Sequence, residues 1–293
     1  MTERWTAADL PDLSGRTVVV TGANSGIGLV AARQLAGVGA HLVLAVRDEA
    51  KGHDAAATIS GSTEVRRLDL ADLSSVRAFA ADWDGDLDVL INNAGVMALP
   101  ERRTVDGFEM QFGTNHLGHF ALTNLLLPHL TDRLVTVSSG AHRMGRIDVD
   151  DLNWERRRYR SWPAYGQSKL ANLLFTLELE RRLADAGSEV RALAAHPGYA
   201  ATNLQSHTGN PVAKALMAVS NRVIAQSDER GALPVLYAAT ADLPGGSYVG
   251  PDGFQEARGH PTLVGRSAAA SDLDTAAALW AASERLTATT FPD

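Results

Sequence analysis

A tyrosine and a lysine, Tyr165 and Lys169, lie four positions apart in the sequence. On a helix this spacing places both side chains on one face, about one turn apart. A free phenol has a pKa of about 10, too high for acid–base catalysis at neutral pH, but a nearby ammonium group stabilises the phenolate. The pair therefore predicts a phenol that exchanges a proton with a substrate oxygen. The alternative is a lysine that only packs over an exposed ring.

A glycine-rich segment near the start of the chain has the composition of a phosphate-binding turn. It follows a run of β-branched residues and leads into a helical pattern. Glycines there let the backbone approach a pyrophosphate, whose charge is favoured by the free N–H groups at a helix N-terminus. The alternative is a glycine-rich turn without a ligand. The candidate phosphate-binding residues are Gly22, Asn24, Ser25, Gly26, Ile27 and Gly28.

Strand-like and helix-like patterns alternate along the chain and supply the elements that would position these residues. Strands fed by helices imply right-handed crossovers and a parallel sheet covered on both faces. No linker or repeat divides the chain, so we predict one α/β domain over residues 1–293, a Rossmann-type doubly wound parallel sheet with helices on both faces. The predicted strands are 17–20, 41–46, 64–68, 88–91, 134–137 and 190–194, and the predicted helices are 27–35, 48–59, 73–83, 107–130, 164–186 and 273–286.

Composition and charge exclude several classes of protein. The 293 residues include no cysteine, which excludes disulfides, cysteine-ligated metals and thiol nucleophiles. The 27 Lys and Arg against 34 Asp and Glu give a net charge of −7, which argues against a nucleic-acid-binding protein. No apolar stretch approaches the roughly 20 residues that span a bilayer, and the N-terminus lacks a signal-peptide pattern. We expect a cytoplasmic protein with no membrane span. We expect no metal either, because four histidines lack metal-ligand spacing: His116, His119, His142 and His196.

Several motifs together resemble those of the short-chain dehydrogenase/reductase family. Three residues separate the first two glycines of the turn, as in that family. The resemblance covers about residues 15–250, and each motif falls in the order that the family uses. Two runs, 115–120 and 168–172, are most similar to the retinol-dehydrogenase-like branch. The further matching positions are Asn92-Asn93-Ala94-Gly95, Asn115, Ser139, Tyr165, Lys169 and Pro197-Gly198.

The resemblance implies a role for each matching residue. Tyr165 would be the general acid or base, and Lys169 would lower its pKa and hold the cofactor ribose. Ser139 would orient the substrate oxygen, with its neighbour Ser138 as the competing candidate, and Asn115 would order a relay water. The cofactor-binding set would be completed by Asp69 and Leu70 at the adenine, Asn93, Ala94 and Gly95 along the adenosine, and Pro197, Gly198 and Thr202 at the nicotinamide.

The end of the second predicted strand bears on the choice between the two nicotinamide cofactors. An acidic residue there usually binds the ribose hydroxyls and repels a 2′-phosphate, but this sequence has Val46 followed by Arg47. Arginine can hold a phosphate with two charge-assisted hydrogen bonds, which favours NADP(H) over NAD(H). The alternative is a solvated Arg47 whose field Asp48 offsets.

These observations predict an NADP(H)-dependent oxidoreductase that interconverts a carbonyl and an alcohol on a largely apolar small molecule. One alternative is a double-bond reductase like the light-dependent protochlorophyllide reductases. They carry a cysteine two residues after the lysine, where this chain has Ala171. Another alternative is a non-catalytic NADP(H)-binding regulatory protein, which would have no need of Ser139 or Asn115. Relatives often dimerise through the two long helices, so we expect a homodimer.

Two segments are expected to shape the substrate cleft, and a third carries no chemistry that we can identify. The segment 140–163 is a predicted substrate loop whose aromatic residues form a wall and whose arginines are solvated or meet an anionic substrate. The segment 199–226 is a predicted lid, and 250–293 is a C-terminal extension. The loop residues concerned are Trp154, Tyr159, Trp162, Arg156, Arg157, Arg158 and Arg160, and those of the lid are Tyr199, Leu204, Leu216, Met217, Val219 and Val223.

Overall fold

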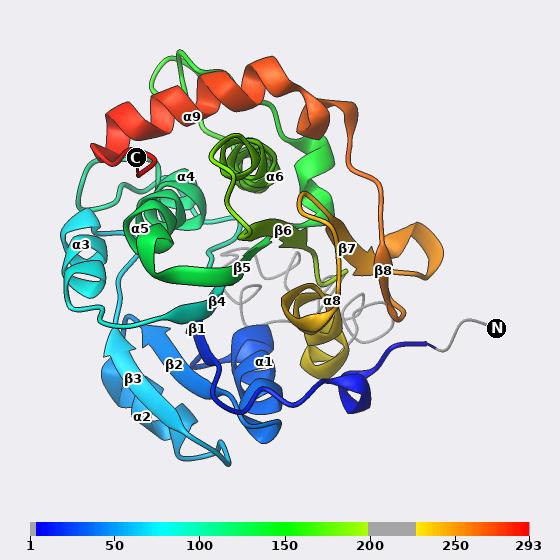
Figure 1. Ribbon diagram of the computed structural model, residues 1–293. Coiled ribbons are helices and arrows are strands. Elements are labelled where there is room, and N and C mark those ends of the chain that lie inside the picture. Colours follow the sequence, from blue (N-terminus) through cyan, green and yellow to red (C-terminus); the bar gives the residue numbers. More distant parts are fainter. Residues whose placement is uncertain (1–3, 199–226, 293) are drawn as a thin grey trace, which may run out of the picture.

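Eight strands form one sheet in the order β3-β2-β1-β4-β5-β6-β7-β8. This arrangement is seen in a computed structural model that describes residues 4–198 and 227–292 (Figure 1). Neighbouring strands are parallel except for the antiparallel pair β7 and β8. The predicted doubly wound α/β sheet is confirmed. The strands are β1 (Thr17–Thr21), β2 (His41–Val46), β3 (Thr63–Arg67), β4 (Leu87–Asn92), β5 (Leu130–Val137), β6 (Arg191–Ala195), β7 (Tyr248–Pro251) and β8 (Pro261–Leu263).

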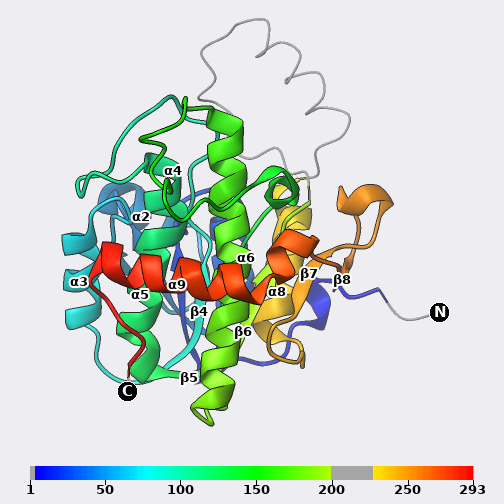
Figure 2. The same ribbon diagram turned by 90° about the horizontal axis from the view of Figure 1, so that it is seen from above.

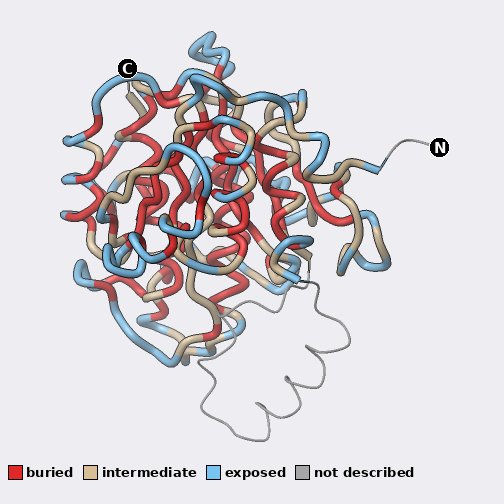
Figure 3. The backbone as a smooth tube through the Cα atoms, turned by 90° about the horizontal axis from the view of Figure 1, so that it is seen from below, coloured by how far each residue is buried: buried red, intermediate tan, exposed pale blue. Residues whose placement is uncertain are grey.

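Helices cover both faces of the sheet because side chains alternate between the faces along each strand. Val18 and Val20 pack in the hydrophobic cluster of α1, α2 and α8, whereas Val19 packs in that of α3, α5, α6 and α9. Figure 3 shows buried residues through the centre of the molecule and exposed residues at its periphery. The helices are α1 (Gly26–Gly37), α2 (Glu49–Ala56), α3 (Leu73–Ala81), α4 (Met110–Phe112), α5 (Gly118–Leu126), α6 (Ser161–Asp185), α8 (Asp228–Thr240) and α9 (Leu273–Thr287).

The predicted helix over 107–130 is wrong in its bounds and its regularity. The helix starts only at Met110, because the carboxylate of Glu109 accepts hydrogen bonds from the first backbone N–H groups. A π turn, Gly113–Leu117, then separates α4 from α5. A π turn widens the helix by one residue and is frequent at functional sites. Asn115 lies inside this turn, so the irregularity falls on a predicted catalytic residue.

Three elements near the C-terminal end were not predicted from the sequence. The strands β7 and β8 have four and three residues, too short to show a periodic pattern. The helix α8 contains Pro234, which interrupts a helical pattern. Together these elements extend the sheet past β6 and cover the face that α1 also covers. Among the helices of residues 4–198 and 227–292, none is long and apolar enough to cross a membrane.

The C-terminal helix α9 lies across the outer surfaces of α5 and α6 (Figures 1 and 2). Trp280 anchors it: the indole is buried, with its ring centroid 4.8 Å from that of Phe120 and 5.8 Å from that of Phe175. Farther along, His116 Nε2 is 2.9 Å from the hydroxyl of Ser283. The homodimer contact expected from the sequence would use these same two helices, and α9 covers them.

Candidate active site

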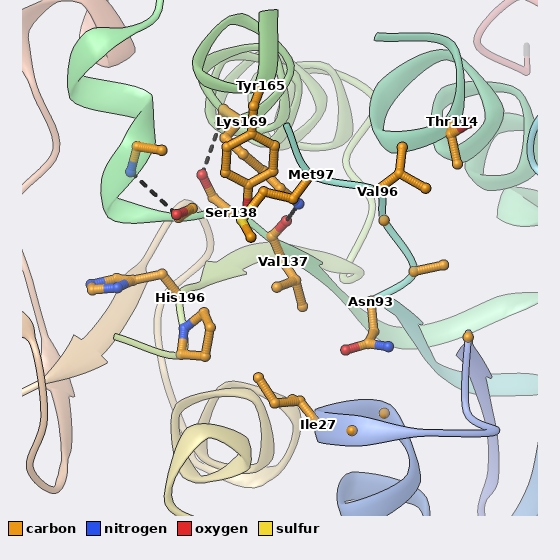
Figure 4. Close-up of a pocket in the computed structure, with 18 of the residues that line it drawn as sticks. Ile27, Asn93, Val96, Met97, Thr114, Val137, Ser138, Tyr165, Lys169 and His196 are labelled. Carbon is orange, nitrogen blue, oxygen red and sulfur yellow. Dashed lines mark hydrogen bonds between the residues drawn. The ribbon is translucent and has the colours of Figure 1, made fainter. Parts of the chain in front are cut away.

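A pocket of about 980 Å³ lies at the carboxyl ends of the strands of the parallel sheet. It is centred between β1 and β4, where the strand order reverses and doubly wound sheets bind ligands. Thr202 and the predicted lid are outside the described residues. All other predicted cofactor residues line the pocket, some of them shown in Figure 4: Gly22, Asn24, Ser25, Gly26, Ile27, Gly28, Arg47, Asp69, Leu70, Asn93, Ala94, Gly95, Tyr165, Lys169, Pro197 and Gly198.

The glycine-rich turn between β1 and α1 needs its glycines for close packing as well as for backbone conformation. Gly22 has a φ of 67°, which L side chains rarely adopt. A Cβ atom on Gly28 would lie 2.4 Å from the Asn93 side-chain nitrogen and 2.7 Å from the Gly22 carbonyl oxygen. No side chain caps α1, since the hydroxyl of Ser25 makes no capping bond. The first N–H groups of the helix therefore face the pocket, as a bound pyrophosphate would require.

Arg47 is exposed at the pocket edge and pairs with no acidic side chain in the described residues. Its neighbour Asp48 pairs with Lys51 instead, with 3.1 Å between Oδ2 and Nζ. Asp48 also accepts a hydrogen bond from the backbone of Lys51 at the start of α2. Val46, where an acid usually stands, is buried. The positive charge of Arg47 is therefore available to a ligand in the pocket.

Asp69 and Leu70 line the pocket after β3. Asp69 was also a candidate cap for α3, but the cap is Asp72, whose side chain accepts hydrogen bonds from two backbone N–H groups of the helix. Asp69 instead stabilises its own turn, accepting from the backbone N–H of Ala71 at 3.0 Å.

Tyr165 and Lys169 lie one turn apart on α6, and both are almost completely buried. The ammonium nitrogen is 5.8 Å from the centre of the phenol ring and donates a hydrogen bond to the carbonyl of Val137, 3.0 Å away. Figure 4 shows the two side chains beside each other above Val137. Ser139 follows the end of β5, at the same wall of the pocket.

The pKa values at this wall depart from the simple expectation of a phenol acidified by the lysine. Burial raises the pKa of Tyr165 to about 12, and a hydrogen bond with the hydroxyl of Ser139 opposes part of that rise. Burial also lowers the pKa of Lys169 to about 8. The chain alone therefore keeps the phenol protonated, as a proton donor must be before it acts.

Asn115 does not line the pocket but lies behind its wall, fully buried. Its amide oxygen accepts from the backbone N–H of Val96 at 2.7 Å. Its amide nitrogen donates to the Val96 carbonyl and to the Ser168 hydroxyl, both at 2.9 Å. Both amide N–H donors and one lone pair of the amide oxygen are thus used, which holds the Asn115 side chain in place behind the wall.

The predicted aromatic wall is only partly present. Trp162 lines the pocket beside Met144, and both are exposed at its mouth. Trp154 and Tyr159 were predicted to join this wall but pack against each other away from it, with ring centroids 5.8 Å apart. Arg157 lies over the ring of Trp154 and pairs with Asp151, which holds this part of the loop against the core.

The far wall of the pocket contains residues that the sequence analysis did not assign. Arg143 comes from the predicted substrate loop, and Gln255 and Glu256 come from the C-terminal extension. The Glu256 carboxylate lies 3.1 Å from His196 Nε2 and 3.4 Å from an Arg143 nitrogen. Gln255 and Glu256 both have positive φ, 50° and 56°. No sequence pattern marks these positions, because the fold alone brings them to the cleft.

Within the described residues, no three His, Asp or Glu side chains are grouped so that they could hold a metal ion. Burial lowers the pKa of His196 to about 4 and that of His119 to about 4, so both rings are neutral at pH 7. The site therefore combines a pocket lined by the glycine-rich turn, a phenol and ammonium pair, and a serine.

Comparison with known proteins gives four findings. A family model described as short chain dehydrogenase matches residues 16–213. Retinol dehydrogenase 13 from Homo sapiens is 45% identical over 292 residues, an alignment that covers 94% of this chain and 85% of that protein. A crystal structure of an uncharacterized protein from Mycobacterium paratuberculosis is 60% identical, with a TM-score of 0.87, and covers 99% of this chain and 100% of that chain. Pseudomonas aeruginosa RhlG, solved as an active-site complex with NADP, is 26% identical with a TM-score of 0.63, covering 81% of this chain and 94% of its own.

Proposed function

The chain belongs to the short-chain dehydrogenase family, in its retinol-dehydrogenase-like branch, and from this membership we propose a specific activity. The protein is an NADP(H)-dependent oxidoreductase that interconverts a carbonyl and an alcohol on a largely apolar small molecule. The observation that carries the proposal is the meeting of Tyr165, Lys169 and Ser139 at one wall of the pocket. The cleft for the dinucleotide opens directly beside that wall.

Tyr165 is the proton donor for the substrate oxygen in the direction of reduction. Its phenol is protonated in the pocket, because burial keeps its pKa high. Ser139 donates a hydrogen bond to the same oxygen and holds it within reach of the phenol. As the proton leaves, the buried ammonium of Lys169 stabilises the phenolate that forms. The Asn115 carbonyl holds the relay water that returns a proton towards the lysine.

NADP(H) supplies the hydride when it is bound, and the residues of the chain fit it. The turn between Gly22 and Gly28 packs so closely that a Cβ at Gly28 would collide with Asn93 and Gly22, and this close packing suits a backbone-to-pyrophosphate contact. Arg47, without an acidic partner in the described residues, is the group that holds a 2′-phosphate. Asp69, Leu70 and the 93–95 segment line the cleft where the adenosine half would lie.

An apolar substrate fits the open end of the pocket. Met144 and Trp162 stand exposed at its mouth, and the relatives are named for retinol, an apolar alcohol. Preference for NADPH favours reduction in the cell. Retinal and medium-chain aldehydes are therefore the first substrates to try.

The experiment that tests the proposal is a screen of purified protein with NADPH and a series of aldehydes and ketones, including retinal and straight-chain aldehydes of rising length. We expect NADPH consumption with the apolar members. Replacing Tyr165 by Phe should keep NADPH binding, followed by cofactor fluorescence, and lower turnover by roughly 10²-fold or more. Tight NADPH binding without turnover on any member would instead indicate the regulatory binding protein. Near wild-type turnover of Y165F would overturn the mechanism.

The cytoplasmic location and the homodimer stay predictions. A homodimer of this chain would have to use a surface other than the outer sides of α5 and α6, because α9 covers them. Light scattering at micromolar protein gives the mass in solution. If the wild-type chain is a dimer in solution, with Trp280 holding α9 in place, the dimer contact lies elsewhere on the molecule.

A further inference from the structure

A buried histidine outside the pocket connects the glycine-rich turn to the π turn. His119 is the second residue of α5 and is 1% exposed. One ring nitrogen, Nδ1, is 3.0 Å from the backbone carbonyl of Asn115, and the other, Nε2, is 2.9 Å from the hydroxyl of Thr21. Thr21 is the last residue of β1 and directly precedes Gly22.

We propose that His119 is a positioning residue that sets the direction of the Asn115 carbonyl and couples it to the dinucleotide-binding turn through Thr21. The proposal deepens the proposed function and rests on it, since there the Asn115 carbonyl holds the relay water.

The hydrogen bonds determine which nitrogen of His119 carries the proton. A carbonyl oxygen can only accept, so the Nδ1 that faces Asn115 must donate. In a neutral imidazole the other nitrogen then accepts, and Nε2 takes a hydrogen bond from the hydroxyl of Thr21. The ring is neutral because burial lowers its pKa to about 4, and the nearby ammonium of Lys169 acts in the same direction. The other titratable ring nearby, His116, is likewise buried and neutral, with its pKa lowered to about 3.

The hydroxyl of Thr21 is left with no spare hydrogen-bonding capacity. Its oxygen accepts from the backbone N–H groups of Asn93 and Ala94, each at 2.9 Å. Both of its lone pairs are thereby used, and its single proton goes to His119, which is closer than the Ile91 carbonyl at 3.4 Å. The ends of β1 and β4, which form the dinucleotide cleft, therefore meet at one hydroxyl whose proton points to His119.

The carbonyl of Asn115 is the atom on which this connection acts. The side chain of Asn115 is held by its hydrogen bonds to Val96 and Ser168. The direction of the Asn115 backbone carbonyl inside the π turn is therefore set by the ring of His119. The Asn115 side chain and the Lys169 ammonium both border Gly95: a Cβ there would lie 3.1 Å from the one and 3.5 Å from the other. The histidine bond uses one lone pair of the carbonyl, and we assign the second to the relay water.

Four substitutions separate the two contacts of His119. H119F removes both. H119N keeps the bond to Asn115, because an asparagine on the same helix, Asn124, donates to the carbonyl four residues before it at 2.8 Å. T21V removes the hydroxyl, and with it both the bond to His119 and the acceptor for the N–H groups of Asn93 and Ala94. H116F is the matched control, because His116 is equally buried one turn away but bonds to Ser283 of α9.

We expect H119F to lower kcat by on the order of ten-fold and to weaken NADPH binding, because a small displacement of a positioned group carries a cost of this order or more. H119N should keep kcat within about two-fold of the wild-type value. Like T21V, it should bind NADPH several-fold more weakly than the wild type. H116F should change neither. Wild-type kcat in a folded H119F, or losses in H116F equal to those in H119F, would overturn the proposal, because either result means that the histidine serves only the core.

A measurement that needs no turnover keeps the proposal testable if H119F does not fold or if no carbonyl substrate is found. In protein labelled with ¹⁵N at histidine, NMR distinguishes the two neutral tautomers. We expect His119 to carry its proton on Nδ1 from pH 6 to pH 8, and T21V to disturb the Nε2 signal of His119 but not that of His116. A proton on Nε2, or a charged ring, would contradict the assignment. Failure of the carbonyl screen with this tautomer in place would count against the proposed function alone.

Discussion

The hydroxyls of Ser138 and Ser139 serve different parts of the molecule although the residues are adjacent in the chain. Ser138 Oγ donates to the backbone carbonyl of Lys169 at 2.8 Å and is buried. Ser139 Oγ accepts from the backbone N–H of Ala141 at 3.2 Å, and Ser139 lines the pocket together with Tyr165. One serine therefore ties β5 to α6, and its neighbour lies at the wall where we propose that the substrate oxygen binds.

Alanine substitutions of the two serines should have opposite signatures. S139A should lower kcat by roughly 10²-fold, the usual cost of losing a donor to the reacting oxygen, and leave the melting temperature near that of the wild type. S138A should lower the free energy of unfolding by about 1–2 kcal/mol because it leaves a buried carbonyl short of a partner, with a smaller effect on kcat. Steady-state kinetics and thermal melts measure both. Equal losses of kcat in S138A and S139A would mean that the Ser139 hydroxyl has no special part in the reaction.

Removing the charge of Arg47 should change the choice of cofactor. R47A is expected to raise the KM for NADPH by about ten- to a hundred-fold, the value of a charge-assisted bond to phosphate, while leaving the KM for NADH nearly unchanged. K51A is the control, since Lys51 also borders the pocket but is paired with Asp48. Initial rates with both cofactors decide the point. A wild-type kcat/KM with NADH that matches or exceeds that with NADPH would refute the role of Arg47.

Replacing Lys169 by Met should abolish most activity and stabilise the folded protein. Burial lowers the pKa of this lysine from its ordinary value of 10.5 to about 8, so the charged form opposes folding at pH 7. The penalty is on the order of 3 kcal/mol, which predicts a rise of several degrees in melting temperature. The carbonyl that Lys169 contacts, Val137 O, keeps a second donor in Asn172.

The pH dependence of this stabilisation has a definite sign. Between pH 8 and pH 10.5 the unfolded chain holds a proton on Lys169 that the folded chain has lost, so the stability of the wild type rises with pH in this window. The advantage of K169M should therefore shrink from pH 7 to pH 10. Denaturant unfolding at several pH values tests this, with K51M as an exposed-lysine control. A constant advantage would show that packing, and not charge, is responsible.

Glu256 should affect the carbonyl substrate and not the cofactor. Its carboxylate ties the turn after β7 to His196 and Arg143 at the wall away from the adenosine half of the cleft. E256Q weakens both contacts at nearly constant shape, and we expect a several-fold change in the KM of the longer aldehydes with an unchanged KM for NADPH. Substitution of Phe254 is the control, because this residue lies in the same turn and is 85% exposed but does not line the pocket. A change in the NADPH KM alone would contradict this assignment.

The sequence predicted the parallel sheet well because its strands carry local signals, and the residues it assigned to a cofactor line one pocket, although their role stays a prediction. The strand 41–46 was predicted with the bounds it has, since a run of buried apolar residues marks it. The cofactor residues sit at strand ends, and the order of strands brings those ends together. Such positions can be predicted without knowing any side-chain contact.

The parts that were not predicted depend on contacts between distant segments. The π turn around Asn115 is stabilised by bonds to Val96 and Ser168, neither of which a helical pattern reveals. Glu256 reaches the pocket only because the short β7–β8 hairpin returns there. His119 carries no sequence signal beyond its lack of metal-ligand spacing, and only its two hydrogen bonds distinguish it from the equally buried His116.

The position of α9 also determines the order in which this chain can complete its fold. Trp280 closes a cluster that includes Phe120 and Phe175, and the carbonyl of Thr287 accepts a hydrogen bond from Arg77 at 2.6 Å. These contacts join residues separated by more than a hundred positions. During synthesis the aromatic faces of α5 and α6 therefore stay open until α9 has left the ribosome, a period in which exposed apolar surface favours aggregation or chaperone binding. The docking of α9 is thus a late step of folding for the layer that holds Tyr165 and Lys169.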